Sequence, residues 1–174
     1  MQDKIIISGK IIFEPQDITT KHGKQSSWKK IAMVFIDGDV CDYYAWFIQR
    51  RYSIVINPPI RGAHISFIND SIVDLRQNGK LSKEEVELNW LSVKNKWHGK
   101  EINITLDLDP RSNYEHWWLN IPNEDRDDLQ SIRNELGLGR PYFGMHMSLG
   151  YVHPKYIEHS KYIVDCLIKG FINK

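Results

Sequence analysis

Two stretches of this chain share a frame of residues that could carry acid–base chemistry. One reads PIRGAHISF and contains His64 and Ser66, and the other reads PYFGMHMSL and contains His146 and Ser148. Both follow the pattern P-x-x-G-h-H-h-S-h, where h is an apolar residue. The shared Pro, Gly and apolar positions favour an internal duplication. We therefore expect two similar lobes related by a pseudo-two-fold axis.

The spacing within each stretch predicts which side chains point the same way. In a β-strand, residues i and i+2 share a face, so each histidine projects with its serine while the apolar neighbours face the other way. An imidazole has an ordinary pKa near 6.5, so a neutral and a protonated ring can coexist near neutral pH. The neutral ring can take a proton from an attacking hydroxyl while the cationic ring protonates the leaving oxygen. The hydroxyls of Ser66 and Ser148 can donate to the non-bridging oxygens. Together these groups suit the cleavage of a phosphodiester.

The competing interpretation is that both histidines are structural. That would be the better interpretation of a single H-x-S on a strand, but the duplicated frame favours catalysis. None of the other histidines has Ser or Thr two positions later; they are His22, His98, His116, His153 and His159. The chain carries no H-E-x-x-H, paired C-x-x-C or Gly-rich P-loop sequence, and we expect neither a metal nor a cofactor.

The elements that must position these residues follow from hydrophobic periodicity. The predicted strands are residues 5–13, 30–36, 63–69, 102–108, 114–121 and 145–152. The predicted helices begin after Asp39, Ser82 and Asn123 as candidate N-caps, and at Pro154. The order is β-β-α-β-α-β-β-α-β-α, which lacks the regular crossovers of a doubly wound sheet. We predict one α+β domain spanning residues 1–174, with mainly antiparallel sheets and helices outside.

Composition narrows the choice of partner. The net charge is +1, whereas proteins that grip long nucleic acids usually carry a clear basic excess, so a small ligand is expected instead. No stretch approaches the roughly 18 apolar residues of a membrane span, and the N-terminus does not resemble a signal peptide. Cys41 and Cys166 lie in helical patterns without metal-ligand spacing, as in reduced cytoplasmic proteins. No obligate protein partner is expected.

At the two H-x-S stretches the chain resembles the two-histidine (2H) phosphoesterase superfamily, which is defined by two H-x-S/T motifs on a bilobal α/β fold. Segments 42–47, 97–100, 114–120 and 132–138 are similar to the phage anti-CBASS nucleases within it, and the resemblance spans about residues 29–151. Many members have Thr where this chain has Ser66 and Ser148; both supply a hydroxyl.

The resemblance implies that His64, Ser66, His146 and Ser148 form a catalytic quartet. It further implies metal-independent cleavage of cyclic di- and trinucleotide messengers such as 3′,3′-cyclic GMP–AMP, by a phage protein that counteracts CBASS immunity in the host cytoplasm. Attack by the ribose 2′-hydroxyl would give a 2′,3′-cyclic phosphate, and direct attack by water is the alternative. Which histidine is the base stays open.

Five further residues are candidates for holding the substrate. Tyr114 and Trp118 share one face of the predicted strand 114–121 and could stack on bases, with ordinary packing as the alternative. Trp97 continues a core stripe of its helix but lies at the helix end, where it could reach a base. Tyr142 lies in the turn before the second motif. Arg61 adjoins the first motif and could pair with a phosphate, although arginines in turns are usually just solvated.

Two other functions remain compatible with the sequence. One is an RNA 2′,3′-cyclic phosphodiesterase of the same superfamily, and the other is a sponge that binds a cyclic nucleotide without cutting it. The polar loop 16–27 lies between two predicted strands, which makes it a candidate lid over the ligand.

Overall fold

The computed structural model describes residues 3–15, 29–36, 38–142 and 144–170. The long strands are β1 (Lys4–Phe13), β2 (Lys29–Ile36), β4 (His64–Ser71), β5 (Glu101–Asp107), β7 (His116–Asn120) and β8 (His146–Val152). The long helices are α1 (Val40–Tyr52), α3 (Lys83–Trp97), α4 (Asn123–Glu135) and α5 (Ile157–Ile168). The order of these long elements along the chain is β-β-α-β-α-β-β-α-β-α, as predicted. The short elements β3 (Ile56–Asn57), α2 (Ile72–Leu75), β6 (Arg111–Ser112) and η1 (Pro154–Tyr156) were not predicted. The candidate lid, residues 16–27, lies outside the described residues.

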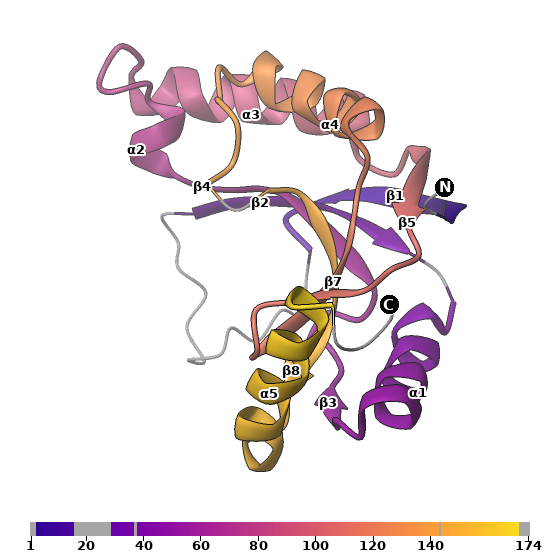
Figure 1. Ribbon diagram of the computed structural model, residues 1–174. Helices are drawn as coiled ribbons and strands as arrows, with labels where there is room; N and C mark the ends of the chain where they lie inside the picture. Colours follow the sequence, from indigo (N-terminus) through magenta and orange to yellow (C-terminus); the bar gives the residue numbers. More distant parts are fainter. Residues whose placement is uncertain (1–2, 16–28, 37, 143, 171–174) are drawn as a thin grey trace.

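The described strands form one eight-stranded sheet. Its order is β5-β1-β2-β4-β8-β7-β6, with β3 pairing to β8 beside this path, and every one of these pairings is antiparallel. The prediction of an α+β fold with antiparallel pairing is therefore confirmed, with a single sheet in place of separate ones. The sheet curls strongly, and β4 and β8, which carry the two H-x-S motifs, lie at its centre (Figure 1).

The helices cover one face of the sheet. Figure 1 shows α3 and α4 side by side over one half of the sheet, and α1 and α5 against the other half. Between helices and sheet lies a continuous core, to which the central strands contribute Ile65, Phe67, Met147 and Leu149, all no more than 1% exposed. These are the apolar neighbours of the motif residues. The alternation predicted from the sequence is thus confirmed, because the core takes one face of β4 and β8 and leaves the other to the motif side chains.

Two matching connections surround the motif strands. One runs β2–α1–β4 and the other runs β7–α4–β8, and in each the two strands pair with one another. Each connecting helix packs against the motif strand of the other connection. From α1, the Cys41 thiol lies 3.6 Å from the Ser148 carbonyl oxygen on β8. From α4, Arg133 Nη1 donates to the Phe67 carbonyl oxygen on β4 at 2.8 Å.

The predicted N-cap residues of the helices differ in what they do in the structure. Ser82 caps α3 as predicted, since its hydroxyl accepts from the Glu85 amide and the Glu85 carboxylate accepts from the Ser82 amide. Asp39 precedes α1 but makes no side-chain cap hydrogen bond. Asn123 was predicted to be the N-cap of α4. It is instead the first helical residue, and Pro122 occupies the N-cap position. No helix in the described part of the chain is long and apolar enough to cross a membrane.

Candidate active site

The pairing of β4 with β8 brings the two motifs together. His64 stands opposite Ser148 and Ile65 opposite Met147, so continuing this register by one step would bring Ser66 opposite His146. Residues directly opposite in an antiparallel pair point to the same face, and diagonal neighbours lie roughly 7–8 Å apart. The four side chains therefore share the face that the helices leave open, with the two histidines on one diagonal.

Both histidines are anchored in the same way. His64 Nδ1 lies 2.8 Å from the carbonyl oxygen of Gly62, and His146 Nδ1 lies 2.6 Å from that of Gly144. A carbonyl oxygen only accepts, so in both rings Nδ1 carries the hydrogen and donates it. Nε2 is then the nitrogen that gains and loses a proton. The same contact, two residues back in each motif, gives both rings the tautomer that acid–base catalysis through Nε2 requires.

The glycine of the first motif has a conformational role. The Gly62 amide donates to the Pro59 carbonyl oxygen at 3.0 Å, which closes a turn, and Gly62 has a φ of 67°. A left-handed φ strains any residue with a Cβ, so glycine is favoured here. The turn directs the Gly62 carbonyl to the His64 ring.

A third histidine belongs to the site. His116 Nε2 lies 3.2 Å from Ser148 Oγ, and its ring centroid lies 5.4 Å from that of His146. The His116 ring also stacks on that of Tyr151, with centroids 4.9 Å apart. Burial, together with the nearby His146 and His64, lowers the pKa of His116 from 6.5 to about 4. His116 is therefore neutral at neutral pH and serves as a fixed hydrogen-bond partner of Ser148.

Positive charge dominates the surroundings of the histidines. Burial lowers the pKa of His64, and Arg61 and His146 lower it further against the opposing effect of the Gly62 carbonyl. Burial also lowers the pKa of His146, with Arg126 adding to the effect against the Gly144 carbonyl. No described carboxylate contributes to either shift, or to that of His116. An anion placed among these groups would raise the three pKa values again.

Aromatic rings flank the quartet on both sides. On β2, Phe35 stands opposite His64, with ring centroids 6.4 Å apart. On β7, Trp118 stands opposite Ser148, and its ring lies 5.8 Å from that of His146. The Trp118 indole nitrogen donates to Asn120 Oδ1 at 3.1 Å, which fixes the orientation of the ring. Trp118 was predicted to contact the substrate; Phe35 was not, because it lies in an apolar run that predicts only a buried strand.

Other predicted contacts lie elsewhere. The Tyr114 hydroxyl lies 3.3 Å from Asp165 Oδ1 on α5, on the helix side of the sheet. Tyr114 has a φ of 78° and β7 begins only at His116, so the alternation that placed Tyr114 beside Trp118 ends before it reaches Tyr114.

Trp97 packs among the helices. Its indole nitrogen donates to Glu135 Oε1 of α4 at 3.1 Å, and the ammonium groups of Lys96 and Lys100 lie 5.1 Å and 4.8 Å from its ring. It is part of the α3–α4 interface and does not join the quartet. Tyr142 is 94% exposed in the segment that leads into β8. Among the predicted contacts, Trp118 lies beside His146, and Arg61 lies close enough to His64 to lower its pKa.

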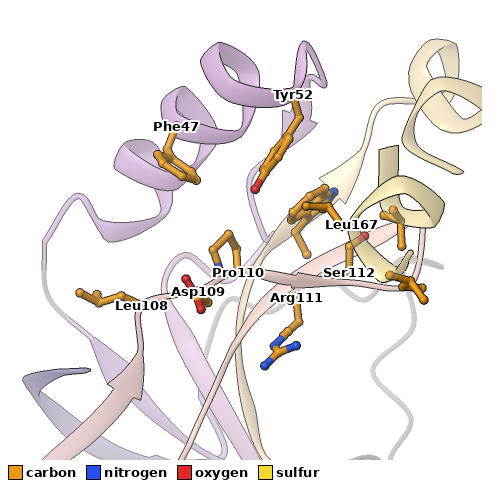
Figure 2. Close-up of a pocket in the computed structure, with 11 residues that line it drawn as sticks. Phe47, Tyr52, Leu108, Asp109, Pro110, Arg111, Ser112 and Leu167 are labelled. Carbon is orange, nitrogen blue, oxygen red and sulfur yellow. The ribbon is translucent and has the colours of Figure 1, made fainter. Parts of the chain in front are cut away.

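A separate cavity lies on the helix side. Figure 2 shows it between α1, the segment 108–112 and α5, with a volume of about 340 Å³. Its lining residues are Phe47, Tyr52, Leu108, Asp109, Pro110, Arg111, Ser112, Trp117, Val164, Leu167 and Ile168. Trp117 points to the opposite face from Trp118, so this cavity and the quartet lie on opposite sides of β7. The acid–base groups, and not this cavity, mark the candidate active site.

No group of three or more His, Cys, Asp or Glu side chains in the described ranges is arranged to hold a metal ion. Comparisons of the chain with protein-family models, with curated proteins and with solved structures give no match.

Proposed function

We propose that this chain is a metal-independent phosphodiesterase that cleaves 3′–5′ bonds of cyclic di- and trinucleotides, with a bilobal fold of the two-histidine phosphoesterase type. The observation that carries the proposal is the matched anchoring of His64 and His146. Each ring donates Nδ1–H to a glycine carbonyl two residues back, and the two rings lie on one diagonal of a strand pair. A purely structural histidine has no need of a symmetrical counterpart.

The reaction would run as a proton transfer between the two rings. Neutral Nε2 of one histidine takes the proton of the ribose 2′-hydroxyl, whose oxygen bonds to phosphorus as the P–O5′ bond breaks. The cationic second histidine gives its Nε2 proton to the departing O5′. The product carries a 2′,3′-cyclic phosphate and a free 5′-hydroxyl. Water can open the cyclic phosphate in the reverse sense, with the two histidines exchanging roles.

The serines would stabilise charge on the phosphate. Ser148 and Ser66 lie beside the histidines on the same face, where their hydroxyls can donate to the two non-bridging oxygens. His116 Nε2, 3.2 Å from Ser148 Oγ, orients that hydroxyl. If His116 donates to Ser148 Oγ, the Ser148 proton is directed at the phosphate.

Because the pKa values of His64 and His146 are lowered, substrate binding would itself help to form the catalytic acid. In the free protein, burial and nearby cations favour neutral rings at both positions. A bound phosphodiester anion between them favours the cationic form of one ring. The acid is thereby generated when the substrate arrives.

The two flanking rings and the net charge of only +1 support a small nucleotide with two bases as the substrate. Phe35 and Trp118 stand on either side of the quartet, and stacking on an aromatic ring contributes about 1–3 kcal/mol per base. We place such an enzyme in the host cytoplasm as a phage protein that removes a CBASS messenger.

The test is incubation with 3′,3′-cyclic GMP–AMP in excess EDTA, followed by chromatography. Linear product is expected from the wild type and none from His64→Ala or His146→Ala. His153→Ala is the matched control, because His153 is exposed outside the quartet. Intact substrate with cleavage of RNA 2′,3′-cyclic ends would point to the RNA-processing alternative. Tight binding without turnover would identify a sponge and overturn the proposal.

A further inference from the structure

We propose that Arg111 forms a second phosphate subsite, which selects substrates that carry two phosphodiester groups. The inference rests on the proposed function and specifies its substrate class. The quartet would hold the phosphate that is cleaved, and Arg111 would hold the one that is not.

The register of β6 places Arg111 on the face of the quartet. Arg111 stands directly opposite Trp118, which in turn stands opposite Ser148. His64, Ser148, Trp118 and Arg111 thus form one row across β4, β8, β7 and β6. Figure 2 shows the Arg111 side chain turned away from the helix-side cavity and from Tyr52 above it.

The side chain of Arg111 carries a buried donor that has no partner. Its Nε atom is buried and has no hydrogen-bond partner. Arg111 also forms no ion pair with any described Asp or Glu. Buried donors are nearly always paired in folded proteins, and a guanidinium matches the two oxygens of a phosphate with a bidentate geometry. An unpaired arginine on the face of an electropositive site fits an anion supplied by the ligand.

The spacing fits one nucleoside between two phosphates. Neighbouring strands lie about 4.8 Å apart, so β6 lies about 10 Å from β8 along this row. The Trp118 ring lies between Ser148 and Arg111 and offers a surface on which a base can stack. The row therefore presents a phosphate site, a base platform and a second phosphate site in sequence. A ligand with a single phosphate would occupy the quartet and leave Arg111 unpaired.

The contribution of the second phosphate to binding can be isolated by comparing two ligands. Cyclic di-AMP and adenylyl-(3′→5′)-adenosine both carry two adenines, but only the cyclic molecule has a second phosphodiester. Their affinities are measured by calorimetry in a His146→Ala background, so that the binding test does not depend on turnover. Arg111→Gln is expected to weaken cyclic di-AMP about 10- to 100-fold, as for loss of a charged hydrogen bond, and the linear ligand less than 2-fold. Arg111→Lys should recover part of the loss.

Arg50→Gln is the matched control, because Arg50 is exposed on α1. Equal losses for both ligands, or no loss for either, would overturn the second subsite. Thermal melting of each variant verifies that it is folded, and Arg111→Lys keeps the test valid if Arg111→Gln is not. Turnover of both ligands by the wild type judges the proposed function separately. Cleavage of neither ligand, together with intact 3′,3′-cyclic GMP–AMP, would refute that function, while the calorimetric comparison still decides the role of Arg111.

Discussion

His116 Nε2 and Ser148 Oγ lie 3.2 Å apart although the two residues come from different strands. The contact depends on a β-bulge in the pairing of β7 with β8. Trp117 stands opposite Gly150 but Trp118 opposite Ser148, so β8 has one extra residue at this point. The bulge lets Tyr151 join the face of Ser148 despite an odd spacing, and Tyr151 stacks on the His116 ring.

If His116 orients Ser148, its loss should act on kcat. We expect His116→Ala to lower kcat on 3′,3′-cyclic GMP–AMP about 10- to 100-fold with KM within 3-fold, because a misdirected donor fails in the transition state. Ser148→Ala should have a similar effect. The double variant should be little worse than either single one, since both remove the same interaction. Additive losses would show that the two residues act independently.

The pH profile should reflect the lowered histidine pKa values. One ring must be neutral and the other protonated, so kcat/KM falls when both are protonated at low pH and again when both are neutral at high pH. Because the pKa values of His64 and His146 both lie below the ordinary 6.5, the kcat/KM optimum should fall on the acid side of 6.5. The kcat profile should lie at higher pH, because bound phosphate raises both values.

Arg126→Gln should move this profile. Arg126 lowers the pKa of His146, so its neutralisation should shift the kcat/KM optimum to higher pH. The exposed Arg50 supplies the control, as Arg50→Gln should leave the profile in place. An unchanged optimum in Arg126→Gln would show that its charge is not felt at the site.

Stability should fall in acid through His116. Its pKa is about 4 in the folded chain and near 6.5 when unfolded, so the folded state binds the proton less readily. The associated stability is complete above pH 6.5 and is lost as the pH falls toward 4. The change in the free energy of unfolding should stay below the ~3 kcal/mol that the full shift corresponds to, because solvent screens a partly exposed ring. His116→Gln does not titrate and should remove most of this dependence. Urea denaturation of both proteins at pH 7 and pH 4.5 measures it; parallel losses would contradict the assignment.

The flanking rings should contribute to binding rather than to the chemical step. Trp118→Ala and Phe35→Ala are each expected to raise KM for a cyclic dinucleotide by about 10-fold with kcat less affected, since each removes one stacking surface. Trp97→Ala is the matched control, because Trp97 packs at the α3–α4 interface. Its KM should stay near the wild-type value. An equal rise in all three variants would point to general destabilisation.

Arg133 should be important for stability. It is 1% exposed, and its Nη1 and Nη2 donate to the two carboxylate oxygens of Asp70 at 2.7 Å and 3.0 Å, while Nε donates to the Gly139 carbonyl oxygen at 2.8 Å. Arg133→Ala removes the ion-pair partner of Asp70 and should lower the free energy of unfolding by about 3–5 kcal/mol. Denaturant titration checks this, with Arg50→Ala expected to change it by less than about 0.5 kcal/mol. A loss below 1 kcal/mol would contradict the assigned role.

Periodicity in the sequence predicted faces but not partners. The alternation around His64 and His146 indicates which side of each strand is apolar, and the core of the structure confirms it. The same alternation leaves open which strand lies beside which, because register depends on contacts between distant segments. The pairing of His64 with Ser148 is therefore a property of the fold.

The residues that the sequence missed share a physical reason. Arg111 lies in a two-residue strand, too short for any periodic signal, and Arg126 lies in an acidic segment that indicates only a helix start. Phe35 has apolar neighbours on both sides, which hides the face it presents. The prediction for Tyr114 was wrong for a different reason. It extended the strand alternation past the first residue of β7, whereas the positive φ of Tyr114 turns its side chain toward α5.

The crossed packing of the connecting helices makes the two halves of the chain interdependent. The helix that follows β2 covers β8, and the helix that follows β7 covers β4, so a fragment ending before β5 would lack the cover for its own motif strand. The remaining fragment, which begins at β5, would likewise lack α1 over β8. Each fragment therefore needs the helix that the other one carries. A protein cut between α3 and β5 should thus regain its structure when the pieces are mixed, whereas either piece by itself should stay unfolded.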